Sequence, residues 1–177
     1  MAVLETIKSF FVPAESVAAE KIIPAPPTNY EIKPLTSAEL KDVLRLNLRC
    51  FTAGDSYNKH TLIYLLNEPR TLSYKAATSA GDLAAFAFVM MNPNGAAHLT
   101  TIGVAPEHRR RGVAHRMMKH IEEALRRREV GTILLEVRVS NYGAQQLYRR
   151  LGFHVVQRIA TYYNNGEDCY LMMKALN

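Results

Sequence analysis

The sequence predicts an α/β (α+β) protein with a mixed central sheet of about seven strands, about four flanking helices and an N-terminal extension. The strongest observation is a strand, helix and strand pattern across residues 98–153. A connection of that length makes its two strands parallel, and a right-handed crossover places them side by side. Elsewhere, β-rich runs joined by short turns predict antiparallel strands, so the sheet is expected to be mixed.

Composition and charge indicate a single domain that binds anions. The 177 residues are enough for one domain with one core, and the formal charge of +6 favours anionic ligands. Cys50 and Cys169 have no metal-ligand spacing, so we interpret them as two reduced thiols of a cytoplasmic protein and expect no metal. No apolar run reaches the ~18 residues of a membrane span, and the first residues lack a signal-peptide pattern, so we expect no membrane contact.

A proline-rich stretch divides the chain. Pro24, Pro26 and Pro27 predict a stiff linker, because proline restricts the backbone. Residues 1–28 are therefore interpreted as an N-terminal extension with a Pro-rich linker, and residues 29–177 as the domain. Two helical apolar patterns in the extension predict short helices that dock on the domain or on a partner subunit. A disordered leader is the alternative.

The first half of the domain is predicted to hold three strands and two helices. Thr36 and Glu39 have the spacing of a capping box, which predicts a helix start. The strand at residues 83–91 is apolar on both faces, so we expect it at the centre of the sheet, covered on each side. The elements in order are a strand at 30–34, a helix with Leu40, Val43, Leu44 and Leu48 on its inner face, a helix at 59–67, and strands at 72–78 and 83–91.

The second half is organised around a long amphipathic helix that follows a strand at residues 98–104. Alternation along that strand places His98, Thr100 and Ile102 on one face. The last strand, residues 168–174, is expected to close the sheet. The remaining elements are the long helix with Val113, Met117, Met118, Ile121, Ala124 and Leu125 on its inner face, a strand at 132–139, a helix from Asn141, and a strand from Phe153 to about Tyr162.

The turn before the long helix carries the strongest chemical signal. The start of a helix presents unpaired N–H groups and the positive end of its dipole, and both suit an anion. Gly112 lets the backbone approach a ligand closely, and the turn has neither a Walker pattern nor a dinucleotide fingerprint. We interpret the turn as a pyrophosphate site, with a solvated basic helix start as the alternative. Its residues are Arg109, Arg110, Arg111, Gly112, Val113 and Ala114.

Two motifs resemble those of the GNAT N-acetyltransferase superfamily. The first, V-x-P-x-x-R-x-x-G-x-A, is similar to its acetyl-CoA signature and stands at Val104, Pro106, Arg109, Gly112 and Ala114. The second, from Leu135 to Asn141, resembles the ribosomal-protein-alanine N-acetyltransferases and the archaeal and eukaryotic N-terminal acetyltransferases. The likeness extends over roughly residues 30–176. It implies a GNAT fold for the domain and acetyl-CoA as the co-substrate.

The resemblance implies where acetyl-CoA binds. Arg109 to Ala114 would hold the pyrophosphate, mainly through backbone N–H groups. The backbone around Ile102 and Val104 would pair with the pantetheine arm like an added strand, and Asn141 would bind the arm as well. The two parallel strands would splay apart to open a slot for the thioester.

Three side chains are candidates for acid–base chemistry. Glu136 is the leading candidate for the base, because it interrupts a strand that is otherwise apolar apart from Arg138. A structural glutamate paired with Arg138 is the alternative. His98, on the neighbouring strand, is the second candidate for the base, with an ordinary polar strand residue as its alternative. The resemblance makes Tyr148 the group that contacts and protonates the CoA sulfur, and a purely structural core aromatic is the alternative.

The resemblance also implies a site for the acceptor. In this family a peptide contacts the loop after the first helix and the hairpin of the last two strands, which places Phe51, Tyr162 and Tyr163 against it. An ordinary aromatic strand end is the alternative for the two tyrosines. Thr52 stands where proline is usual, so the preferred first residue of the substrate is left open.

The expected function is acetyl transfer from acetyl-CoA to the N-terminal α-amine of a protein or peptide, of the ribosomal-protein-alanine type, by direct attack in a ternary complex. The alternative is a GNAT enzyme acting on a small-molecule amine or a lysine side chain. An RNA-binding module built on residues 109–111 and 126–128 is disfavoured, because helical spacing keeps these runs from forming one stripe. The acceptor, whether a ribosomal protein or another chain, and the oligomeric state are left open.

Overall fold

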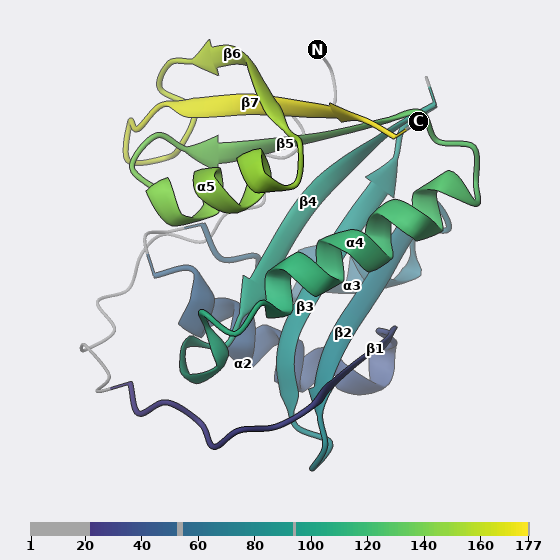
Figure 1. Ribbon diagram of the computed structural model, residues 1–177, viewed down its shortest axis with the longest axis vertical. Coiled ribbons are helices and arrows are strands. Elements are labelled where there is room, and N and C mark those ends of the chain that lie inside the picture. The colour runs from purple at the N-terminus through teal and green to yellow at the C-terminus, as the bar shows by residue number, and fades with distance from the viewer. Residues whose placement is uncertain (1–21, 53–54, 94, 177) are drawn as a thin grey trace.

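The protein is a seven-stranded mixed sheet with helices on both faces (Figure 1). The computed structural model describes residues 22–52, 55–93 and 95–176. The helix expected at residues 2–12 lies outside these ranges, as does all but the last two residues of the one expected at 15–23. The strands are β1 (Tyr30–Pro34), β2 (Thr71–Thr78), β3 (Leu83–Met91), β4 (Ala96–Val104), β5 (Thr132–Arg138), β6 (His154–Ile159) and β7 (Cys169–Ala175). The helices are α2 (Leu40–Cys50), α3 (Lys59–Asn67), α4 (Val113–Arg126) and α5 (Tyr142–Arg150), with short 3-10 turns at Ser37–Glu39 and Pro106–His108.

The sheet has the strand order β1-β2-β3-β4-β5-β7-β6, and β4 and β5 are its parallel neighbours. The predicted crossover from β4 through α4 to β5 is therefore confirmed, as is the mixed α/β fold class. The last strand does not form an edge: β7 pairs with both β5 and β6, so β6 becomes the edge strand and is almost fully exposed.

The pairing between β4 and β5 covers only three residues of each strand, Ala96–His98 against Thr132–Leu134. Beyond His98 the two strands have no paired residues, although both continue for several residues more. The splay that the family resemblance implied is therefore present. It leaves the β5-facing edge of β4 without a strand partner from residue 99 onward, and this opening positions the site.

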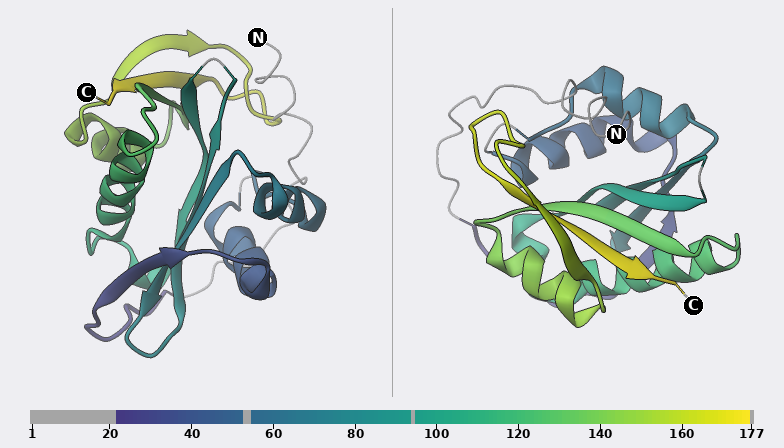
Figure 2. Two further views of the ribbon diagram at one scale, coloured as in Figure 1. Left: turned by 90° about the vertical axis from the view of Figure 1, so that its right-hand side faces the viewer. Right: turned by 90° about the horizontal axis from the view of Figure 1, so that it is seen from above.

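Two apolar clusters cover the two faces of the sheet. The cluster beneath α4 and α5 includes Met117 and Ile121, and the cluster beneath α2 and α3 includes Phe86 and Leu62. Figure 2 shows the two helix layers on either side of the sheet. Strand β3 contributes fully buried residues to both clusters, as expected of a central strand covered on each side.

The inner face of α2 differs from the expected one. The capping box at Thr36 is present, but it opens the 3-10 turn that leads into α2. Leu48 is 47% exposed, whereas Leu46 and Asn47 are buried with Val43. Positions three and four residues after Val43 share its face of a helix, while the fifth points away, which explains the exposure of Leu48.

A β-bulge in β4 overturns one predicted face. The partners of Thr101 and Leu99 on β3 are successive residues, so Thr100 is an extra residue in β4. The extra residue reverses the alternation beyond it. Ile102 therefore packs with Leu99 in the cluster beneath α4, and the prediction that it shares a face with His98 is wrong.

Candidate active site

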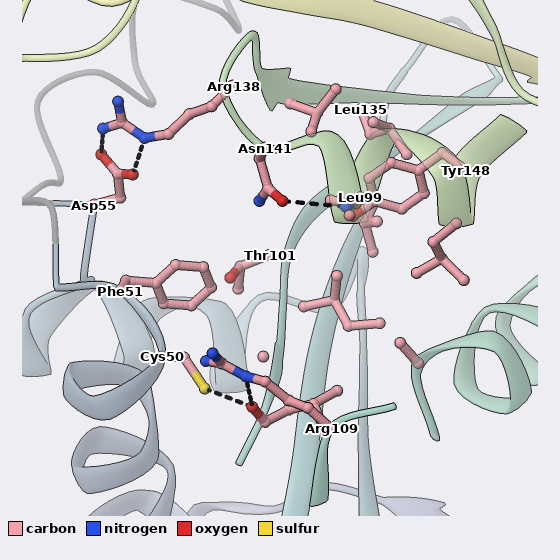
Figure 3. Close-up of a pocket in the computed structure, with 18 of the residues that line it drawn as sticks. Cys50, Phe51, Asp55, Leu99, Thr101, Arg109, Leu135, Arg138, Asn141 and Tyr148 are labelled. Carbon is pink, nitrogen blue, oxygen red and sulfur yellow. Dashed lines mark hydrogen bonds and ion pairs between the residues drawn. The ribbon is translucent and has the colours of Figure 1, made fainter. Parts of the chain in front are cut away.

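A cavity of about 770 Å³ opens where β4 and β5 separate, within the size range of small-molecule sites. Residues from both faces of the sheet line it. Arg109 and Tyr148 come from the α4 and α5 side, whereas Phe51 and Tyr57 come from the loop that follows α2. Figure 3 shows Tyr148 across the cavity from Phe51. Two ligands approaching from opposite faces of the sheet can therefore meet in one space.

The turn that leads into α4 has the backbone shape of an anion site. Arg110 and Gly112 have φ values of +61° and +75°, so two residues of the turn have the left-handed backbone conformation. A left-handed arginine is strained by about 1–2 kcal/mol and persists only where its surroundings hold it. Gly112 is the N-cap of α4 and brings no side-chain oxygen, so the first amides of the helix keep their capacity for a ligand. This arrangement fits the pyrophosphate expected here.

The three arginines of the turn point to different places. Arg109 and Arg110 are exposed and line the cavity, as do Gly112, Val113 and Ala114. Arg111 does not line it. Its guanidinium donates hydrogen bonds to the carbonyls of Pro26, at 2.8 Å, and Ala25 in the Pro-rich linker.

The expected pantetheine-binding strand lies in the cavity wall. Ile102 and Val104 both line the cavity. The Val104 carbonyl already accepts hydrogen bonds from Arg109 Nε at 3.1 Å and from the Cys50 thiol at 3.3 Å. The strand edge available for a ligand is therefore the part of β4 before this carbonyl.

Helix α5 carries Asn141 and Tyr148 to the cavity. The Asn141 side chain caps the helix by accepting a hydrogen bond from the Ala144 N–H at 3.1 Å. Tyr148 is buried beside Phe153, and Figure 3 shows it close to Leu99 and Leu135. Burial raises the pKa of the Tyr148 hydroxyl, so this group keeps its proton at neutral pH, as an ordinary tyrosine also does.

The two candidates for the base, Glu136 and His98, are joined by a hydrogen bond. His98 Nε2 lies 2.6 Å from Glu136 Oε2, and because a carboxylate only accepts, the imidazole N–H donates. Their side chains are 7% and 8% exposed. Glu136 lines the cavity, whereas His98 is not among the lining residues. Glu136 and Arg138 do lie on one face of β5, but the carboxylate pairs with His98 and not with Arg138.

Arg138 instead connects the loop after α2 with the β6–β7 hairpin. Its guanidinium donates to both carboxylate oxygens of Asp55, with Nε at 2.6 Å, and to Glu167 Oε2 at 2.5 Å. It also stacks on the Tyr163 ring, 3.8 Å from the centroid. Figure 3 shows Asp55 facing this guanidinium. One arginine thus fixes two loops against each other at one end of the cavity.

The loop after α2 supplies Phe51 and a second aromatic residue, Tyr57. Phe51 ends α2 and packs edge-on against Phe86. Tyr57 is buried, its hydroxyl donates to the Thr100 carbonyl at 3.1 Å, and the side chain of Asn47 binds its backbone N–H and carbonyl. Burial raises the pKa of Tyr57, and the charge of Glu136 raises it further.

Tyr162 and Tyr163 lie in the connection between β6 and β7, and both line the cavity. The expected strand up to Tyr162 is too long, because β6 ends at Ile159 and Thr161 turns the chain with φ of +51°. The backbone N–H groups of both tyrosines donate to the Glu167 carbonyl at 3.0 Å. The backbone N–H groups of both tyrosines are therefore not available to a ligand.

Sequence reasoning missed Asp55, Tyr57 and the role of Arg138 at this site. The loop that holds the first two has no periodicity, and the Asp55 carboxylate and the Tyr57 hydroxyl bind groups more than 40 residues away in the chain. The available sequence signal is that Asp55 and Arg138 have opposite charges and lie in segments expected near the acceptor. Among the residues described, no three His, Cys, Asp or Glu side chains form a group able to hold a metal, and no helix is long and apolar enough to span a bilayer.

Comparison with known proteins decides the family. The sequence model described as Acetyltransferase (GNAT) family matches residues 40–153. N-alpha-acetyltransferase daf-31 of Caenorhabditis elegans is 31% identical over 147 residues, which is 78% of each chain. The chain belongs to the GNAT acetyltransferase family. The geometry described above is therefore that of a GNAT domain.

Two further proteins similar to this GNAT chain are an N-alpha-acetyltransferase and a ribosomal-protein-alanine N-acetyltransferase. The N-alpha-acetyltransferase of Saccharolobus solfataricus is 40% identical over 80 residues, 45% of this chain and about half, 48%, of that one. The crystal structure of the ribosomal-protein-S18-alanine N-acetyltransferase from Escherichia coli superimposes with a TM-score of 0.77 at 28% identity. That superposition covers 84% of this chain and 95% of the other, so most of this chain shares the fold of that structure.

Proposed function

We propose that this GNAT protein transfers acetyl from acetyl-CoA to the N-terminal α-amine of a protein or peptide by direct attack in a ternary complex. The observation that carries the proposal is the cavity at the β4–β5 splay, lined from both faces of the sheet. The phosphate-binding turn and Tyr148 lie on one side. Glu136 and the two tyrosines of the β6–β7 connection lie on the other. Holding donor and acceptor together in this way supplies much of the catalysis.

When bound, acetyl-CoA supplies an activated acetyl group; the proton transfers belong to this chain. Glu136 accepts the proton of the substrate ammonium, directly or through a water molecule. His98 donates from Nε2 to Glu136 Oε2 and, because it does not border the cavity, it is a positioning residue. Tyr148 lines the cavity and donates its hydroxyl proton to the departing sulfur as the C–S bond breaks. The second proton that the attacking nitrogen loses as the amide forms returns to the Tyr148 oxygen, so the step balances.

The energetics favour an α-amine over a lysine side chain. An α-amine has a pKa of ~7.7–8.0, so about a tenth is neutral at pH 7 and deprotonation costs about 1–1.4 kcal/mol. A lysine has a pKa of ~10.4, and its deprotonation costs about 4.6 kcal/mol. One carboxylate is enough to deprotonate an α-amine. The relatives named N-alpha-acetyltransferase support the same choice. A cytoplasmic location accords with two cysteines that form no disulfide.

The proposal predicts activity confined to free α-amines. The measurement is acetyl transfer from acetyl-CoA to a peptide panel that varies the first residue, including the N-terminus of a ribosomal protein. The same assay includes N-terminally blocked lysine peptides and spermidine. We expect the free α-amine peptides to react and the others to react at least tenfold more slowly, given the cost of deprotonating their amines. If only the lysine peptides or spermidine react, the substrate class is wrong and the small-amine or lysine alternative holds.

A second prediction concerns the acceptor end of the cavity. Arg138→Gln leaves the Asp55 and Glu167 carboxylates without their shared cation and frees the two loops. We expect KM for the peptide to rise on the order of tenfold, with KM for acetyl-CoA within about twofold of wild type. The matched control is Arg158→Gln, which breaks an exposed ion pair with Asp168 in the same hairpin and should change neither constant. Equal changes in both KM values would contradict a role at the acceptor end.

A further inference from the structure

The Pro-rich linker is attached to the phosphate-binding turn by a two-way contact. Arg111 donates to the carbonyls of Ala25 and Pro26, and the Ala25 N–H donates to the Glu107 carbonyl at 3.0 Å. Further along, Thr28 binds Ser79 of the β2–β3 turn through its hydroxyl and accepts the Ser79 N–H at 3.2 Å. Figure 1 shows this segment running to β1 below the turn that precedes α4.

Residues of α2 and β1 also contact the turn. Arg49 forms two hydrogen bonds with the Glu107 carboxylate, at 3.1 and 2.9 Å. The Tyr30 hydroxyl lies 3.0 Å from His108 Nδ1, and both side chains are buried. These contacts brace the first part of the turn, Pro106–His108. The last part, with the left-handed Arg110, is held on its outer side by the Arg111 contact with the linker.

We propose that residues 24–28 act as a strap, and that Arg111 binds this strap to hold the phosphate-binding turn in the shape that receives CoA. Arg111 is then a positioning residue, and Arg109 and Arg110 are the arginines that face the ligand. The inference rests on the proposed function for the identity of the ligand. It goes beyond the family, because the strap lies ahead of the matched residues.

The chemistry of the strap suits this task. Its prolines keep the segment extended, so little conformational entropy is lost when it binds. Their carbonyls remain acceptors, and the planar guanidinium of Arg111 can reach two successive carbonyls at once. Neutral carbonyls leave the positive charge of Arg111 uncancelled, so the turn keeps its attraction for phosphate.

Three variants of the full chain separate the strap from the charge of Arg111. Arg111→Gln removes both the guanidinium that binds the strap and the positive charge. Arg111→Lys keeps the charge but loses the planar fork. Ala25→Pro keeps every charge of the turn and removes the N–H that donates to Glu107. We expect Kd for CoA to rise on the order of tenfold in the first and at least about threefold in the other two.

Binding is measured by titration calorimetry with CoA, and kinetics add a readout that general destabilisation would not reproduce. The strap predicts a higher KM for acetyl-CoA with an unchanged KM for the peptide and unchanged kcat. Arg127→Gln, at the exposed far end of α4, is the matched control for charge and should bind CoA as wild type does.

Each outcome decides between the strap and its alternatives. If Arg111→Gln alone weakens CoA binding, Arg111 acts through its charge and the strap is overturned. Wild-type affinity in all three variants also overturns it. If the wild-type protein itself does not bind CoA, the proposed function fails and the strap fails with it, which the parallel wild-type titration makes plain.

Discussion

Glu136→Gln is expected to lower kcat/KM for a free α-amine peptide by about 10²–10⁴, the usual contribution of a positioned general base. Glutamine keeps the volume, and its side-chain oxygen can still accept the His98 N–H, so the fold and the cavity should persist. What it loses is the capacity to take up the ammonium proton. The measurement is steady-state kinetics with the most reactive peptide of the panel.

The pH profile of the variant tests the same assignment. Without a base, the residual rate depends on the amine that is already neutral, so it should rise about tenfold per pH unit up to the amine pKa of ~7.7–8.0. His98→Gln should reduce the rate by about tenfold only, since it removes a hydrogen bond to the base. Glu123→Gln, an exposed carboxylate on α4, is the control. A Glu136→Gln rate within threefold of wild type, with a greater loss in His98→Gln, would transfer the role to His98.

The largest expected effect on stability lies away from the active site, at Glu122 in α4. Its carboxylate is fully buried and lies 2.7 Å from the ammonium of Lys174 on β7, whose side chain is 13% exposed. Glu122→Ala leaves this ammonium almost buried without its partner. We expect the free energy of unfolding to fall by about 3–5 kcal/mol, out of the 5–15 kcal/mol typical of a domain. Urea denaturation monitored by circular dichroism measures it.

A double variant distinguishes the cost of leaving the Lys174 ammonium unpaired from the net contribution of the Glu122–Lys174 ion pair to stability. In Glu122→Leu with Lys174→Met both charges are replaced by apolar groups of similar volume, and we expect most of the lost stability to return. Glu123→Ala, the exposed neighbour of Glu122, should stay within about 0.5 kcal/mol of wild type. A loss below about 1 kcal/mol in Glu122→Ala would show that the pair contributes little to the fold.

The elements that sequence reasoning placed correctly depend on interactions between near neighbours in the chain. The inner face of α4, from Val113 to Leu125, follows from helical spacing, and all six expected residues are buried. Strands β1 and β3 and helix α3 have the predicted bounds, since alternation, apolar runs and turns mark them locally. A turn at residues 109–112 is predictable for the same reason, because the sequence marks it locally.

The errors have local causes that act without a clear sequence signal. Spacing of four residues from Leu44 predicts Leu48 on the inner face, but the buried stripe of α2 runs through Asn47 instead, whose amide binds Tyr57. Ile102 was assigned by simple alternation, and the bulge at Thr100 reversed it. A buried polar residue and an extra strand residue each break the pattern on which the prediction relied.

The sequence by itself determined the fold class, the crossover unit, the place of the basic turn before α4 and the set of candidate residues. The tertiary structure decided how those candidates are connected. It paired Glu136 with His98, Arg138 with Asp55, Glu122 with Lys174, and Arg111 with the linker. The physical reason is that periodic burial and turns depend on adjacent residues, whereas the partner of a buried charge is chosen by which strands and loops the finished fold brings together.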